Sequence, residues 1–119
     1  MKIGKLGKLQ QHMIIASGAI FLLSGCAKKP ESIAASYVSA NTYQDFTCKQ
    51  LAEESQRLEA AYVVAAKQQE NARTNDTVGV ILLGLPVSSL SGDNIAPEIA
   101  RLKGERNALY SASRTKGCA

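Results

Sequence analysis

The most informative stretch of the sequence for the fold runs from Tyr43 to Arg73, YQDFTCKQLAEESQRLEAAYVVAAKQQENAR. It contains neither glycine nor proline, and alanine, glutamate, glutamine and leucine dominate it, a composition that favours one long helix. Thr42 with Asp45 predicts a capping-box-like start for this helix. One stripe of residues recurs in alternating steps of three and four, which predicts packing against a second helix: Cys48, Leu51, Ser55, Leu58, Tyr62, Ala65, Gln69 and Ala72.

A second helix is predicted from about Asn94 to Thr115, with Asp93 or Ser91 as its cap and Gly117 just past its end. Gly104 interrupts it, and the missing side chain is expected to let the first helix approach at that point. Its stripe again advances by four and three residues: Ile95, Ile99, Leu102, Arg106, Leu109 and Ser113.

The N-terminal 25 residues divide into the parts of a secretory signal peptide. Lys2, Lys5 and Lys8 give a positive start, and an apolar run from Met13 to Leu23 follows. That run is too short to cross a bilayer, which needs about 20 apolar residues.

The run ends in Leu-Ser-Gly-Cys at residues 23–26, which resembles the lipobox of bacterial lipoproteins. The resemblance implies cleavage before Cys26 and acylation of its thiol, with fatty acyl chains such as palmitate holding the protein in membrane lipid. Ala27 follows, rather than the aspartate that marks inner-membrane lipoproteins, and this implies the periplasmic face of the outer membrane. An ordinary buried helix that ends in cysteine is the alternative.

With Cys26 lipidated, two thiols remain, Cys48 and Cys118, in an oxidising compartment. In an antiparallel arrangement the two arms have matching lengths of about 37 Å and their cysteine ends coincide. A disulfide is therefore predicted, two unpaired thiols being the alternative. The expected fold is all-α, an antiparallel two-helix hairpin stapled by this disulfide, with a short apolar segment between the arms. We expect a signal peptide at 1–25, a lipidated N-terminus and flexible tether at 26–41, and the hairpin domain at 42–119.

The apolar segment is residues 78–90, VGVILLGLPVSSL, which carries no charge. One interpretation is a short helix folded back on the hairpin to complete its core. Another is an exposed tip for self-association, a protein partner or shallow membrane insertion, and a third is strand-like pairing between copies. The candidate contact residues are Val80, Ile81, Leu82, Leu83, Leu85 and Val87.

Little in the mature chain predicts catalysis, a cofactor or a metal site. The single histidine, His12, lies in the leader, and oxidised cysteines provide neither a nucleophile nor zinc ligands. Glu53 with Arg57 and Glu70 with Arg73 have the spacing of exposed ion pairs. Three of the 14 basic residues lie in the leader, which leaves 11 interleaved with 10 acidic residues, so nucleic acid is not an expected partner.

Several positions resemble those of small uncharacterised proteobacterial lipoproteins: Cys48, Gln50, Leu51, Glu54, Leu102, Lys103, Gly104, Glu105 and Cys118. That resemblance implies no activity. Our first hypothesis is a membrane-anchored lipoprotein of the cell envelope that acts as a structural or interaction component, such as an accessory subunit of a transport or secretion assembly. The alternative is a membrane-active, lysis- or toxin-like lipoprotein that inserts residues 78–90 into a bilayer. An enzyme is not expected.

Overall fold

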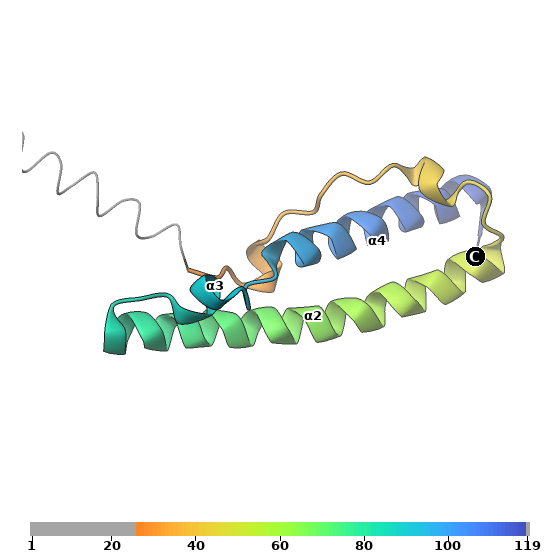
Figure 1. The fold of residues 1–119 in the computed structure, drawn as a ribbon. Helices are drawn as coiled ribbons and strands as arrows, with labels where there is room; N and C mark the ends of the chain where they lie inside the picture. The colour runs from red at the N-terminus through yellow and green to blue at the C-terminus, as the bar shows by residue number, and fades with distance from the viewer. Residues whose placement is uncertain (1–25, 119) are drawn as a thin grey trace, which may run out of the picture.

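The computed structural model describes residues 26–118, so the predicted signal peptide at 1–25 lies outside the described residues. The described part is helical and contains no strand, which confirms the all-α prediction (Figure 1). α4 lies along α2, and α3 lies near the far end of α2, as Figure 1 shows. The elements are the 3-10 helices η1 (Pro30–Ser32) and η2 (Ala40–Tyr43) and the α-helices α2 (Cys48–Leu83), α3 (Val87–Ser91) and α4 (Ala96–Lys116).

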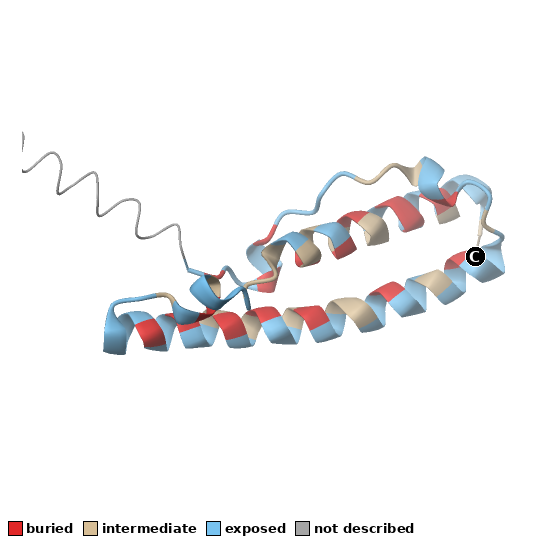
Figure 2. Cartoon of the chain, viewed as in Figure 1, coloured by how far each residue is buried: buried red, intermediate tan, exposed pale blue. Residues whose placement is uncertain are grey.

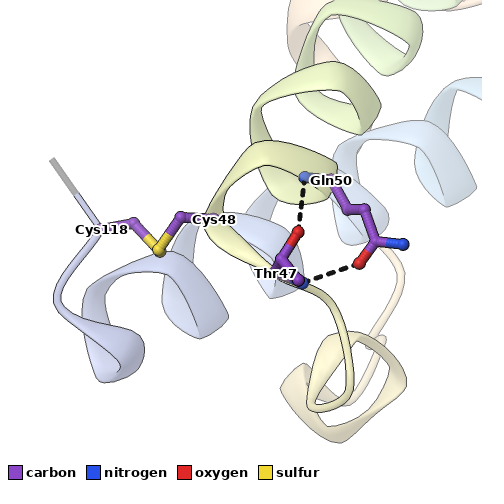
Figure 3. The surroundings of a disulfide bond; sticks show 4 residues. All are labelled: Thr47, Cys48, Gln50 and Cys118. Atoms are coloured by element: carbon purple, nitrogen blue, oxygen red, sulfur yellow. Dashed lines mark hydrogen bonds between the residues drawn. A yellow bond between two sulfur atoms is a disulfide. The ribbon is translucent and has the colours of Figure 1, made fainter.

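α2 begins with a capping box, but five residues later along the chain than predicted. The Thr47 hydroxyl accepts from the Gln50 amide at 3.2 Å, and the Gln50 side chain accepts from the Thr47 amide at 2.8 Å (Figure 3). The predicted cap at Thr42 is wrong because Thr42 belongs to η2, a separate turn capped by the Ser39 hydroxyl. Each of the two helices therefore has its own capping residue, Ser39 for η2 and Thr47 for α2.

The predicted disulfide is present. Cys48, the first residue of α2, is bonded to Cys118, which directly follows the end of α4, and their Cα atoms are 5.5 Å apart (Figure 3). Gly117 ends α4 in the left-handed conformation with a φ of 70° and carries the chain across to the bond. Closing a loop of 70 residues contributes up to roughly 4 kcal/mol in the chain-entropy treatment.

The core between α2 and α4 contains several apolar members of both predicted stripes (Figure 2). Ser55 of the predicted α2 stripe is exposed, and the core also includes Ala108 and Ala112 of α4, which the stripe missed. Leu51 and Leu58 of α2 and Ile99 and Leu102 of α4 are fully buried members of this cluster. Arg106, which interrupts the apolar stripe of α4, connects the two helices instead: it pairs with Glu59 at 2.7 Å and lies over the Tyr62 ring at 4.8 Å. The aliphatic contacts and this ion pair therefore hold the same interface.

The segment predicted to be a flexible tether, residues 26–41, is packed along α4 instead (Figure 1). Ile33 is buried, and the Ser36 amide donates to the Ala100 carbonyl at 2.8 Å. The Lys103 ammonium donates to the carbonyls of Pro30 at 2.6 Å and Ile33 at 2.7 Å. The prediction was wrong because the segment is held largely through its backbone, which leaves no periodic side-chain pattern in the sequence.

Gly104 allows this packing. A Cβ at position 104 would overlap the carbonyl oxygen of Ser36 and would lie 3.0 Å from Val38. The prediction that Gly104 admits α2 is wrong, because the element that approaches it is the N-terminal segment. The glycine inside α4 is a packing requirement, which offsets its poor helix propensity.

We predict that Gly104→Ala lowers the free energy of unfolding by about 1–3 kcal/mol, because the added methyl group must push the N-terminal segment away from α4. Urea unfolding measures this, with Ser111→Ala at an exposed position of α4 as the control for helix propensity. A Gly104→Ala protein as stable as the Ser111→Ala protein would contradict the packing described.

Candidate functional site

An exposed apolar surface forms one end of the molecule, and we call it the apolar tip. Its eight large side chains are between 42% and 75% exposed, and they include all six predicted contact residues. Among the described residues, most of the large hydrophobic side chains that face solvent belong to this surface. The tip consists of Val78, Val80, Ile81, Leu82, Leu83, Leu85, Val87 and Leu90.

The tip exists because α2 continues beyond the predicted end near Arg73 to Leu83, through the apolar segment itself. Gly84 then takes a φ of 72° and its amide donates to the carbonyls of Gly79 and Val80, which ends the helix and reverses the chain. In Figure 1 the chain turns back at this end of α2 and returns to α3. The last two turns of α2 and the reversal therefore project beyond α4.

The returning segment contacts α2 through the Leu85 carbonyl, part of the Val87 side chain and the small polar residues of α3. A Cβ on Gly79 would lie 2.6 Å from the Leu85 carbonyl oxygen, so only glycine admits the segment there. Ser88 of α3 is buried, whereas Leu85, Val87 and Leu90 remain exposed. The segment folds back as one interpretation predicted, but it does not supply the apolar core that this interpretation expected.

A buried carboxylate fixes the returning segment. Asp76 of α2 is 0% exposed, and its oxygens accept from the Ser89 amide at 2.8 Å, the Ser89 hydroxyl at 2.5 Å and the Ala27 amide at 2.9 Å. Burial acts to raise the pKa of Asp76, but the hydrogen bonds from Ser89 and Ala27 outweigh it and hold that pKa below its usual value. Asp76 therefore joins α3 and the start of the described chain to α2 as an ionised group.

Gln69, on the same face of α2, joins that helix to the N-terminal segment and to the residues that lead into α4. Its amide nitrogen donates to the Lys28 carbonyl at 3.0 Å and to the Asn94 side chain at 2.9 Å, and its oxygen accepts from the Ile95 amide at 2.8 Å. Sequence reasoning placed Gln69 in the stripe but missed Asp76. Continuing the stripe past Ala72 by four residues would have identified Asp76.

Cys26 lies close to the apolar tip. It is an exposed, free cysteine, and the next residue, Ala27, is buried and bonded to Asp76. In Figure 1 the described chain begins beside α3. Along the axis of α2, Leu83 lies about 10 Å from Asp76, whereas Cys48 lies about 42 Å from it in the opposite direction.

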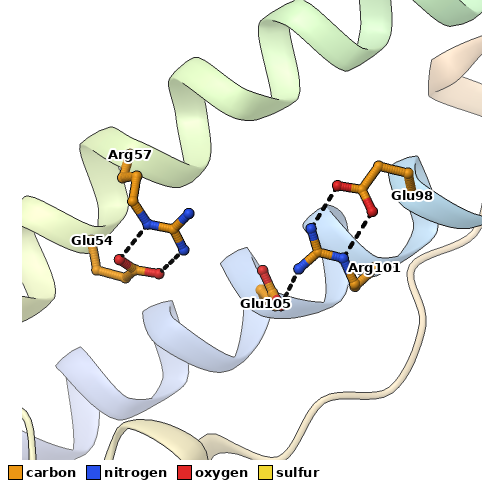
Figure 4. Close-up of polar contacts among 5 residues, drawn as sticks. All are labelled: Glu54, Arg57, Glu98, Arg101 and Glu105. Atoms are coloured by element: carbon orange, nitrogen blue, oxygen red, sulfur yellow. Dashed lines mark hydrogen bonds and ion pairs between the residues drawn. The ribbon is translucent and has the colours of Figure 1, made fainter.

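Carboxylates on α2 and α4 are held by arginines (Figure 4). Arg57 pairs with Glu54 on α2, and Arg101 pairs with Glu98 at 2.6 Å and Glu105 at 2.5 Å on α4. Hydrogen bonds from these arginines lower the pKa of Glu54 and of Glu98. A general acid at neutral pH needs the opposite shift.

One predicted ion pair has a different partner. Arg57 binds Glu54, and Glu53 lies 3.8 Å from Lys49 instead. The predicted pair of Glu70 and Arg73 is confirmed at 2.6 Å. Pairs as exposed as these contribute little to stability.

Comparison of the chain with protein-family models, curated proteins and solved structures found no match. Within residues 26–118, none of the helices combines the length and the apolar character that a membrane span requires. The same residues contain no group of three or more histidine, cysteine, aspartate or glutamate side chains placed to hold a metal ion.

We predict that Asp76→Asn lowers the free energy of unfolding by about 2 kcal/mol near pH 7, because the ionised carboxylate accepts three hydrogen bonds in a buried position. Since folding lowers the pKa of Asp76, its stabilisation is complete above the usual aspartate pKa and is lost as the pH falls through the lower folded-state value. Urea unfolding at pH values from about 7 to about 3 measures the difference between the two proteins.

That difference should shrink as the pH falls below about 4. Asp45→Asn, at an exposed position, is the control and should change the free energy of unfolding little at either end of this pH range. A difference between Asp76→Asn and the unmodified protein that is the same at all pH values would show that the charge of Asp76 does not stabilise the cluster.

Proposed function

We propose that the chain is a lipoprotein of the cell envelope, anchored through acylated Cys26, and that it serves as a structural or interaction component. The leader sequence with Leu-Ser-Gly-Cys at residues 23–26 supports the anchor, and the exposed free thiol of Cys26 agrees with it. The bond between Cys48 and Cys118 supports an oxidising compartment such as the periplasm. In this proposal α2 and α4 are the two arms of a stapled hairpin that extends from its anchored end.

The apolar tip is the observation that carries the interaction part of the proposal. Soluble monomeric proteins rarely leave large contiguous apolar surfaces in water, and those that do use them for contact. Here eight exposed, large apolar side chains lie at one end of the molecule, and a disulfide joins α2 to α4 at the other end. A component of this kind presents a contact surface at a fixed place, to lipid or to another protein, and an accessory subunit of a transport or secretion assembly is one example.

A membrane-active protein of the lysis or toxin type is the second candidate function. The observation that favours it is the same uncharged tip, since an apolar helix end of this kind can enter a lipid surface. Release of a dye trapped in vesicles separates the two candidates, because a structural component leaves the bilayer sealed.

We predict that Cys26→Ser abolishes incorporation of an alkyne-tagged palmitate analogue in growing cells and moves the protein from the membrane fraction to the soluble fraction, because the thiol is the acyl acceptor. Gel fluorescence after coupling to a dye measures the label. Cys118→Ser, which removes a disulfide partner, is the control and should keep the label. Label that persists in the Cys26→Ser protein would refute the anchor.

A further inference from the structure

We infer that the apolar tip inserts shallowly into the same bilayer that holds the lipid on Cys26, so that the protein is attached to its membrane at two neighbouring points. This inference rests on the proposed function for the first point, the lipid anchor. The second point is the surface formed by the end of α2 and the reversal that follows it. It makes the bilayer, and not a second protein, the occupant of the tip.

The residue that follows Cys26 is held against α2 near the apolar tip. The hydrogen bond of 2.9 Å from the Ala27 amide to Asp76 holds the residue after Cys26 against α2. Leu83, the last residue of α2, lies only about 10 Å farther along the helix axis. Amphipathic elements bury their apolar faces about 5–10 Å into the boundary between headgroups and acyl chains, so an anchor at Cys26 brings the tip to that depth.

The distribution of charge fits the same orientation. Residues 77–92 carry no charged side chain, and Asp76 is buried beneath α3. Lys28 and Lys29, which follow the anchor, are exposed and can face the phosphates of lipid headgroups. The end of the molecule thus combines an apolar surface with lysines beside it, an arrangement that suits the border between acyl chains and headgroups.

The geometry also sets the depth of insertion. Val78–Leu83 is the apolar end of α2, about 9 Å long, and the chain reverses at Gly84. Behind it lie Asp76 and Ser89, whose polar groups bind one another, and the buried Ser88. The inserted part is therefore a short wedge and the polar cluster stays at the surface. Two signals of moderate strength give a far more stable attachment than either gives alone.

The absence of tryptophan from the chain allows a direct test. Leu83→Trp places a fluorophore in the tip, and Val64→Trp places one elsewhere on α2 at a matched position, since the two native side chains are 70% and 69% exposed. Each mature, acylated protein is reconstituted into phosphatidylcholine and phosphatidylglycerol vesicles, with and without brominated acyl chains. Circular dichroism and an intact disulfide confirm that both variants are folded.

We expect the brominated chains to quench Leu83→Trp severalfold and its emission to shift to shorter wavelength, while Val64→Trp stays unquenched. Equal, weak quenching of both variants would overturn the inference and leave the tip free for a protein partner. Release of a trapped dye at the same protein concentration would also overturn it, because a second anchor leaves the bilayer intact. The mass of the N-terminal peptide tests acylation of Cys26 separately. An unmodified Cys26 would refute the proposed anchor. Unquenched Leu83→Trp in acylated protein would refute only the insertion.

Discussion

Three hydrogen bonds to the buried Asp76 carboxylate fix α3 and the N-terminal segment on α2, and the form of the apolar tip depends on them. An ionised carboxylate removed from water must be satisfied by donors, and here the donors come from Ala27 and from Ser89, which are distant from each other in the chain. Their convergence turns the segment after α2 back along the helix through small, polar residues. The large apolar side chains of the same segment are consequently left on the outside, where they form the tip.

The two ends of the molecule are stabilised by different chemistry. At one end, the covalent bond between Cys48 and Cys118 joins α2 to α4. At the other, hydrogen bonds of Asp76 and Gln69 join α2 to α3 and to the N-terminal segment. The apolar core of Leu51, Leu58 and their partners connects these ends. The molecule therefore has two different ends: one is closed by the disulfide, and the other is apolar and lies near Cys26. This polarity suits a protein that is attached to a surface at one end.

The sequence predicts those parts of the fold that side-chain periodicity encodes. The buried leucines of both stripes and the pairing of Cys48 with Cys118 follow from spacing and are found in the structure. The packing of residues 26–41 does not follow, because backbone carbonyls and amides hold that segment and every residue type carries them. Of the candidate site, the apolar residues were evident from the sequence. Their exposure was not, because it depends on Asp76, a polar residue at a buried position of the stripe, and on the small residues Gly79 and Ser88.

If, as we propose, the protein is anchored through Cys26 and its tip enters the bilayer, photo-crosslinking in living cells will detect the contact. A photoreactive amino acid at position 83, with position 64 as the reference on the same helix, reports what each surface touches before the membrane is disrupted. We expect lipid adducts from position 83, identified by mass spectrometry, and none from position 64. A discrete protein adduct from position 83 would contradict this expectation and would identify that protein as the occupant of the tip.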